Sequence, residues 1–384
     1  MSLRMMGTLV GWWMYELTGD PLALGLIGLS EVIPAVSMAL YAGHIVDLND
    51  RRKMILRSVI SYILCLFALT SIAFLDFHAV TGKPLIIGSI FSVIFFTGII
   101  RAFSGPSFGA SIGHLVPVKL LPNATAWSQG SWLMASVIGH GSVGFLIAGF
   151  GVKGALLIMS LMCITAFLIF LKLPAIPPPE TAETRTWERM KEGLRFVWKT
   201  KTLLAAMSLD LFAVLLGGAV AMLPVFAKDI LKVGPVGFGW LNAAGDLGSI
   251  LVVTMMMIVP LSSNQGKMLI MSVFGFGASI VVFGLSSNFW LSLAALFMGG
   301  LLDGISIVVR GTILQLQTPA HLRGRVLSVN SMFINSSNEL GQFESGVAAR
   351  LFGTVPSVII GGSLTMLVSL FTWLKAKELR KLNY

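Results

Sequence analysis

The stretch Gly43-His-Ile-Val-Asp47-Leu-Asn-Asp50-Arg51-Arg52-Lys53 separates two long apolar runs, residues 22–42 and 54–75. Each run is long enough to cross a bilayer, which takes about 20 apolar residues. A carboxylate followed by a basic triplet at the end of such a run is typical of a short cytoplasmic loop. The glycine at its head allows another helix to approach closely. The stretch therefore predicts a protein embedded in a membrane.

Composition excludes a soluble globular protein. The chain has 384 residues, of which 55% are hydrophobic and only 11% charged, whereas soluble domains are about 25% charged. The sequence predicts an all-α membrane protein with twelve transmembrane helices. We place them at residues 3–18, 22–47, 54–75, 84–114, 126–149, 151–172, 202–228, 237–261, 268–286, 289–316, 324–350 and 356–375. The first is short for a span, at about 22 Å of helical rise, so we expect it to be truncated by a missing preceding stretch.

The net charge of +10 does not indicate nucleic-acid binding, because the basic residues are distributed by side of the membrane. With both termini and the even-numbered loops in the cytoplasm, twenty of the 27 Lys and Arg residues fall on that side and five on the other. Arg101 and Arg310 remain inside spans. This excess orients the protein with both termini cytoplasmic.

Cysteine and histidine give no sign of a cofactor. Cys65 and Cys163 both fall within predicted spans, and the five histidines form no ligand pair at helical spacing. The sequence therefore predicts no disulfide framework, no metal site and no cofactor.

A proline-rich segment, Leu173-Pro-Ala-Ile-Pro-Pro-Pro-Glu180, divides the chain. It predicts a six-helix bundle over residues 1–172, a cytoplasmic linker over 173–201 and a second six-helix bundle over 202–384. Within the linker, Trp187, Met190, Leu194 and Val197 recur at helical spacing among basic residues. This pattern indicates an amphipathic helix lying in the membrane interface, although a solvated linker without a special role fits the pattern equally well.

The two halves resemble each other. Phe95–Arg101 aligns with Phe297–Asp303 at an offset of 202 residues, and the same offset pairs Gly139 with Gly341 and Gly144 with Gly346. A persistent offset favours duplication over chance, and hence two pseudo-symmetric bundles around a central site, as in many transporters.

Gly43-x-x-x-Asp47 with Arg51-Arg52-Lys53 is similar to the loop motif of the major facilitator superfamily, and the resemblance covers nearly the whole chain. Further segments resemble its bacterial exporter branch, which includes the enterobactin exporter and macrolide-efflux group: residues 17–25, 210–218, 310–315, 323–326 and 338–346. The chain departs from the family pattern at Leu48 and Asp50, and Gly139-His-Gly-Ser-Val-Gly144 replaces the glycine–proline motif associated with antiporters.

The resemblance implies a gating loop formed by Gly43, Asp47, Arg51, Arg52 and Lys53. Asp47 would sit against the N-terminus of the segment that begins near Arg323, where the helix dipole favours an anion. In the family this contact closes the cytoplasmic side and its release opens it. The alternative is that these residues only determine topology.

Ionisable side chains inside a membrane are costly and mark functional sites. Eight fall deep within the predicted spans: Glu31, Arg101, Asp210, Asp246, Asp303, Arg310, Glu339 and Glu344. We predict that the seven other than Asp246 are candidates for binding protons or substrate. Asp303 and Arg310 lie seven residues apart, two turns along one helix face, which favours cross-helix partners such as Glu339 or Asp210. Ion pairs that only hold the helix bundle together are the alternative.

The resemblance implies a secondary transporter, not an enzyme, in a bacterial inner membrane. We expect proton-coupled efflux of a small amphipathic molecule, such as a drug, macrolide or siderophore, by a monomer working through alternating access. No Walker-type loop for ATP is present in the sequence. Uptake by symport or uniport on the same fold remains an alternative, and a membrane-embedded lipid-modifying enzyme is a more remote one.

Overall fold

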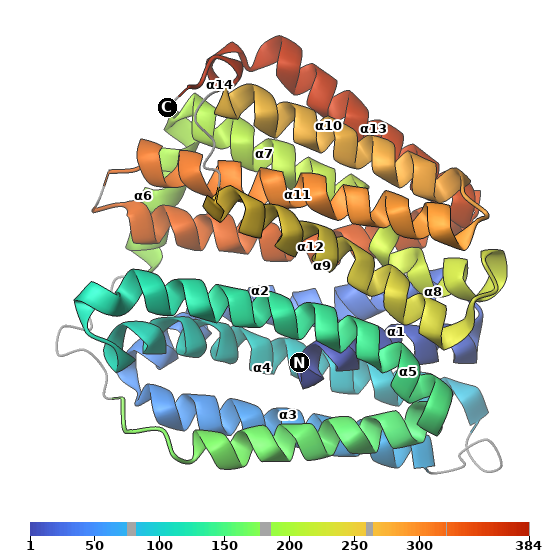
Figure 1. The fold of residues 1–384 in the computed structure, drawn as a ribbon. Coiled ribbons are helices and arrows are strands. Elements are labelled where there is room, and N and C mark those ends of the chain that lie inside the picture. The colour runs from blue at the N-terminus through green and yellow to red at the C-terminus, as the bar shows by residue number, and fades with distance from the viewer. Residues whose placement is uncertain (75–81, 177–185, 259–263, 320, 384) are drawn as a thin grey trace. The chain divides into compact units, whose positions relative to one another are not determined.

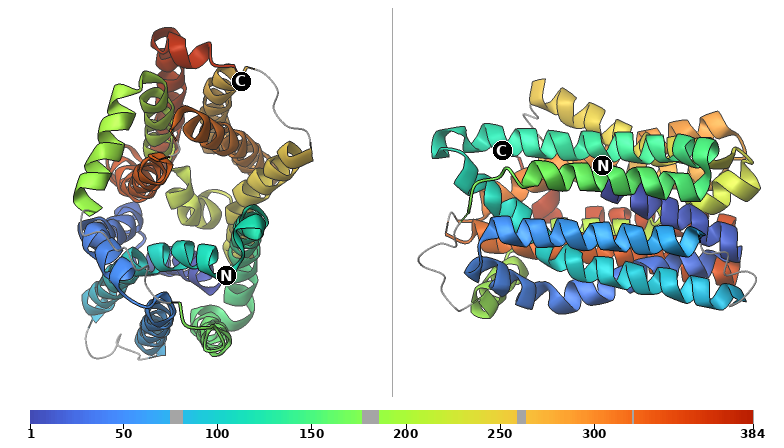
Figure 2. Two further views of the ribbon diagram at one scale, coloured as in Figure 1. Left: turned by 90° about the vertical axis from the view of Figure 1, so that its left-hand side faces the viewer. Right: turned by 90° about the horizontal axis from the view of Figure 1, so that it is seen from below.

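The computed structural model describes residues 1–74, 82–176, 186–258, 264–319 and 321–383, and throughout these ranges the chain forms helices and no strands. For some helical residues in these ranges, including Asp47 and His114, the backbone alone is described. The helices group into two compact units (Figures 1 and 2). Unit 1 comprises Met1–Gly19 and Leu29–Thr186, and unit 2 comprises Asp20–Gly28 and Trp187–Tyr384.

Unit 1 is built from long helices. They are α1 (Ser2–Thr18), α2 (Pro21–Leu48) from Leu29 onward, α3 (Arg51–Phe74), α4 (Gly82–Leu115), the short 3₁₀ turn η2 (Val118–Leu120) and α5 (Leu121–Phe170). Helix α3 packs against α4 and α5, and α1 packs against α5. The side chain of Ser2 donates a hydrogen bond of 3.0 Å to the carbonyl of Met159, which ties the start of α1 to α5.

Unit 2 contains the remaining helices, apart from Thr186 at the start of α6, and the first eight residues of α2. In chain order they are α6 (Thr186–Lys199), α7 (Lys201–Leu216), η3 (Ala219–Met222), α8 (Leu223–Val225), η4 (Phe226–Ile230), α9 (Gly234–Ile258), α10 (Gln265–Leu285), α11 (Phe289–Gln317), α12 (Arg323–Phe352), α13 (Thr354–Lys375) and α14 (Lys377–Arg380). Helix α10 packs between α11 and α13, α9 packs on α11, and α12 packs on α7 (Figure 1).

Nine helices in the described residues are long and apolar enough to cross a membrane. The prediction of an all-helical chain that crosses the membrane several times is therefore confirmed for this part of the chain. One of the nine, Asn123–Phe170, has 48 residues, a rise of roughly 72 Å against a hydrocarbon core of about 30 Å. Gly151 interrupts it with φ 67° and ψ 179°, a backbone conformation outside the helical region.

Small residues set the spacing of the helices in unit 2. A Cβ on Gly300 would collide with the backbone of Gly245, so α9 and α11 touch directly. Ser249 reinforces this contact by donating a hydrogen bond of 2.9 Å to the carbonyl of Gly300. Gly277 and Gly362 bring α10 and α13 together in the same way. Such contacts are the usual basis of helix packing in a bilayer, where the hydrophobic effect does not drive association.

The helix predicted in the linker exists as α6, but its packing differs from the prediction. Val197, which we expected on the face toward the membrane interface, is only 1% exposed. It belongs to the apolar core of unit 2 together with Leu203 of α7 and Val326 of α12. Helix α6 therefore packs against the body of unit 2 through this side.

Candidate functional site

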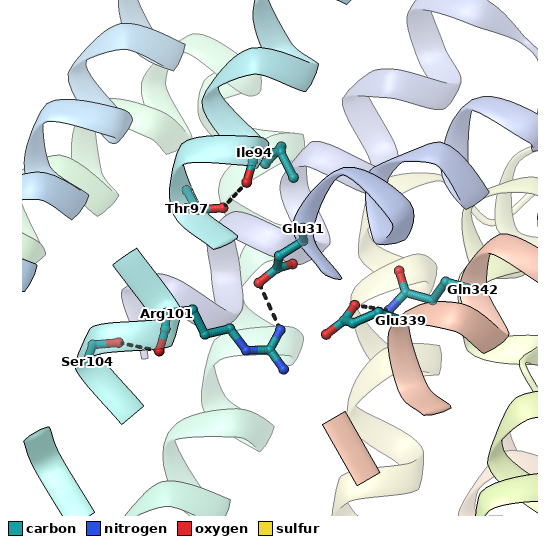
Figure 3. Close-up of polar contacts among 7 residues, drawn as sticks. All are labelled: Glu31, Ile94, Thr97, Arg101, Ser104, Glu339 and Gln342. Atoms are coloured by element: carbon teal, nitrogen blue, oxygen red, sulfur yellow. Dashed lines mark hydrogen bonds and ion pairs between the residues drawn. The ribbon is translucent and has the colours of Figure 1, made fainter. Parts of the chain in front are cut away.

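Unit 1 holds an ion pair between α2 and α4. The guanidinium of Arg101 donates to the carboxylate of Glu31 at 2.9 Å (Figure 3). The exposed fraction of the side chain is 33% for Arg101 and 27% for Glu31, so the pair is partly open to its surroundings. Both residues were predicted as candidates, and the structure brings them together across 70 positions of sequence.

The pair depends on an unusually close approach of the two helices. A Cβ on Gly98 would collide with the carbonyl oxygen of Glu31 and would come within 2.7 Å of the Pro34 ring. Gly98 lies one turn before Arg101 on α4, and Pro34 lies one turn after Glu31 on α2. A glycine opposite a proline therefore sets the distance at which the carboxylate and the guanidinium meet.

Uncharged polar groups surround this pair. Tyr62 of α3 is buried and hydrogen-bonds to Ser104, and its phenol also feels the charges of Glu31 and Arg101. The Ser104 hydroxyl donates in turn to the backbone carbonyl of Arg101 (Figure 3). Tyr62 and Ser104 are not among the residues predicted from the sequence, although the tyrosine at position 62 stands alone in an apolar span.

Unit 2 holds a second ion pair, which is sealed. Arg310 of α11 pairs with Asp210 of α7, and the exposed fractions of the two side chains are only 5% and 8%. Asp210 is one of the two cross-helix partners, with Glu339, that the spacing of Asp303 and Arg310 favoured. A hydrogen bond also joins α13 to α7, since the Thr365 hydroxyl donates to the carbonyl of Ala213 at 3.4 Å.

The remaining candidates lie elsewhere in unit 2. Asp303 of α11 is partly exposed and feels the charge of Asp246 on α9. Glu339 of α12 is buried and accepts a hydrogen bond of 3.3 Å from Gln342 (Figure 3). Glu344 is half-buried, with a hydrogen bond to Ser345.

The basic end of the predicted gating loop anchors α3. The backbone N–H of Arg51 donates to the carbonyl of Ile176 at 3.0 Å, and the Arg52 guanidinium donates to the carbonyl of Leu171 at 2.8 Å. Both contacts tie α3 to the chain just after α5. Among the described residues, no atom lies within 4 Å of a Cβ built on Gly43. The side chain of Asp47 lies outside the described residues.

Acidic and sulfur-containing side chains do not gather into a metal centre in the described part of the chain, where no group of three or more His, Cys, Asp or Glu residues could hold an ion. Two ion pairs, Glu31–Arg101 and Asp210–Arg310, instead lie within the units of apolar helices.

Comparison with known proteins agrees with this geometry. The profile of the family described as transmembrane secretion effector matches residues 4–383. The chain belongs to this family. Transmembrane secretion effectors are a branch of the major facilitator superfamily, so the predicted resemblance to that superfamily and its exporter branch is confirmed.

Relatives of this family member include enterobactin exporters. The chain is 24% identical to the enterobactin exporter EntS of Shigella boydii serotype 4 (strain Sb227) over 364 residues, which are 93% of this chain and 84% of that protein. It is also 24% identical to EntS of Escherichia coli O157:H7 (strain EC4115 / EHEC) over 363 residues, 92% of this chain and 84% of that one.

Solved structures share the fold of this transmembrane secretion effector. A mutant of the nucleoside transporter NupG superposes with a TM-score of 0.72 at 14% identity, covering 97% of this chain and 96% of the other. A POT family transporter in complex with 5-aminolevulinic acid gives 0.73 at 12% identity, covering 99% and 94%. A D-xylose-proton symporter gives 0.67 at 12% identity, covering 97% and 96%. These solved structures show the fold alone. Membership of the family, together with the candidate membrane spans, makes the chain a multi-pass membrane transporter.

Proposed function

We propose that this transporter exports a small amphipathic molecule in exchange for protons, by alternating access, and that it is not an enzyme. It works as a monomer in a bacterial inner membrane with both termini in the cytoplasm. Two six-helix halves, residues 1–172 and 202–384, rock about a central site and are joined by the linker 173–201. Twin halves of this kind are a common transporter architecture.

Twelve spans are consistent with the nine candidate helices. Asn123–Phe170 is long enough for two crossings and breaks at Gly151. Helix α1 is a full helix of 17 residues, and α12 has 30 residues with a more polar sequence. Counting α1, α12 and the second crossing of α5 completes the twelve.

Export is supported by the relatives. The curated proteins that match this chain include enterobactin exporters at 24% identity. We propose a substrate of comparable character, a siderophore, macrolide or other drug-like molecule with both apolar and polar parts. Uptake on the same fold is the alternative, and the direction of proton movement distinguishes the two.

The single observation that supports proton coupling is the difference in side-chain exposure between the two ion pairs. Glu31 and Arg101 each keep more than a quarter of their side-chain exposure, whereas Asp210 and Arg310 are sealed. A partly exposed carboxylate can take up and release a proton, and its protonation removes the charge that holds Arg101. Arg101 is then available to attract an anionic group of the substrate. Asp210–Arg310 instead serves as a fixed link between α7 and α11, and Asp303, Glu339 and Glu344 are secondary candidates.

The gate proposed on the cytoplasmic side is formed by Gly43, Asp47, Arg51, Arg52 and Lys53. The contact of Arg51 with Ile176 ties the start of α3 to the linker, and the contact of Arg52 with Leu171 ties it to the residue after α5. Both contacts support a role for this loop in transmitting movement. Asp47 remains the residue expected to hold the gate closed.

The test uses proteoliposomes with a pH-sensitive dye inside and a substrate panel that includes enterobactin and a macrolide. We expect a substrate gradient to drive protons in the opposite direction in the wild type. Glu31→Gln keeps the shape of the side chain but cannot ionise, so it should abolish coupled proton movement while leaving substrate exchange.

Glu16→Gln is the matched control, because Glu16 is an exposed carboxylate on α1. It should transport as the wild type does. Substrate movement without protons in the wild type, or normal coupling in Glu31→Gln, would contradict the proposal. Protons moving in the same direction as the substrate would indicate symport.

A further inference from the structure

Helix α6 has two different faces, of which the core of unit 2 covers one. A Cβ on Gly193 would lie 3.0 Å from the backbone of Arg325 on α12, so the two backbones are nearly in contact. Val197, one turn later, is buried, and Glu192 forms an ion pair with Arg325. This face therefore fixes α6 to the first turn of α12.

The other face is basic and aromatic. It lines an open hollow of about 350 Å³ formed by Lys191, Leu194, Arg195, Trp198 and Lys199. These positions follow the i, i+3, i+4, i+7, i+8 spacing of one helix face. Trp198 is 68% exposed and Leu194 is 37% exposed, and all three cationic residues are exposed as well. We call these five residues the outer face of α6.

The outer face is held close to a membrane surface by the chain itself. Helix α6 ends at Lys199, Thr200 follows in an extended conformation, and α7 begins at Lys201 as a candidate membrane span. Figure 1 shows α6 lying across the ends of the long helices of unit 2. In the left view of Figure 2, which looks along those helices, α7 is seen nearly end-on and α6 is seen lengthwise. A helix placed in this way runs along the membrane surface.

We propose that the outer face of α6 binds the headgroups of anionic phospholipids in the leaflet where α7 begins, and thereby holds α12 in place through Glu192 and Gly193. Three cations in a row complement phosphate groups, and juxtamembrane basic clusters are attracted to anionic leaflets. Tryptophan beside them matches the aromatic residues that anchor helices at the level of the headgroups. The inference concerns lipid and is independent of the substrate and of the coupling ion.

The full-length protein is tested in phosphatidylcholine vesicles that contain a graded fraction of brominated phosphatidylglycerol or, separately, brominated phosphatidylcholine. Bromine quenches nearby tryptophan fluorescence, and Trp198→Phe identifies the share of the signal that Trp198 contributes. We expect the anionic lipid to quench Trp198 at a mole fraction about tenfold lower than the zwitterionic lipid.

Lys191→Gln, Arg195→Gln and Lys199→Gln are combined in one variant, which should lose this preference. The matched control replaces Lys375, Lys377 and Lys381 with glutamine, which removes the same charge from exposed positions in α13 and around α14. It should keep the preference. Equal quenching by the two lipids in the wild type, or an equal loss in the control variant, would overturn the proposal. Neither measurement requires transport, so the outcome is separate from that of the proposed function.

Discussion

Asp210 and Arg310 form an ion pair that fastens α7 to α11 in the apolar interior of unit 2, where less than one tenth of either side chain is exposed. In unit 1, Glu31 and Arg101 form a chemically similar pair that stays partly exposed. The same pair of functional groups therefore occurs in two environments within one chain. The difference determines what happens when each pair is broken.

Removing one partner of the sealed pair should destabilise the protein strongly. Asp210→Leu leaves the Arg310 charge buried and unpaired, which costs about 3–5 kcal/mol in comparable buried pairs. Replacing both residues, as in Asp210→Leu with Arg310→Met, should recover much of the loss, because no buried charge is left. Thermal unfolding of the purified protein in detergent measures both. Strictly additive losses in the double variant would show that the two side chains do not act as a pair.

Adding a methyl group at Gly98 should disrupt the open pair. In Gly98→Ala the new Cβ collides with the Glu31 carbonyl and the Pro34 ring, so α2 and α4 must move apart, at a cost of about 1–3 kcal/mol. We expect a lower melting temperature and a large loss of transport, since Glu31 and Arg101 separate. Gly88→Ala is the control on the same helix, because no described atom lies within 4 Å of its Cβ. Equal activity in the two variants would disprove the role of Gly98.

The break in α5 should be sensitive to substitution at one position. Gly151 has φ 67° and ψ 179°, a region that is used almost only by glycine and that an alanine adopts at a cost of about 1–3 kcal/mol. Gly151→Ala should therefore lower the melting temperature. Gly149→Ala, two residues earlier and without a positive φ, should leave it unchanged or raise it slightly. A stabilising effect of Gly151→Ala would mean that α5 runs through this point as one continuous helix.

The same break predicts which residues reach the outside of the cell. If α5 contains two crossings, the exposed Lys153 lies just past the outer end of the first. After Cys65 and Cys163 are replaced with alanine, Lys153→Cys should react with a membrane-impermeant maleimide added to spheroplasts. Lys201→Cys, at the start of α7, should react only after the membrane is opened. Reaction of both from the same side would contradict the proposed topology.

Features that depend on a single helix or on composition could be predicted from the sequence. The apolar runs predicted the spans, and the end of one predicted segment at residue 149 and the start of the next at 151 agree with the non-helical Gly151. The seven-residue spacing of Asp303 and Arg310 excluded a direct pair on one helix. It pointed to Asp210 as one of two partners for Arg310, which is the contact observed.

Contacts between helices were harder to predict. The partner of Glu31 depends on how closely α2 approaches α4, and that distance is set by Gly98 against Pro34, not by any pattern along one helix. Tyr62 was overlooked for the same reason, since its polar surroundings come from α2 and α4. Val197 was assigned to the membrane-facing side because helical periodicity does not show which of two apolar surfaces covers a residue.

The near contact between Gly193 and the backbone of Arg325 has a practical consequence for experiments that express the two halves as separate polypeptides. Cutting the chain after Lys199 would leave α6 on the wrong fragment and expose the start of α12. Cutting between Ile176 and Thr186 keeps α6 with the fragment it packs against. Co-expressed fragments divided at the second position should reassemble, whereas those divided at the first should depend on α6 supplied by the other piece.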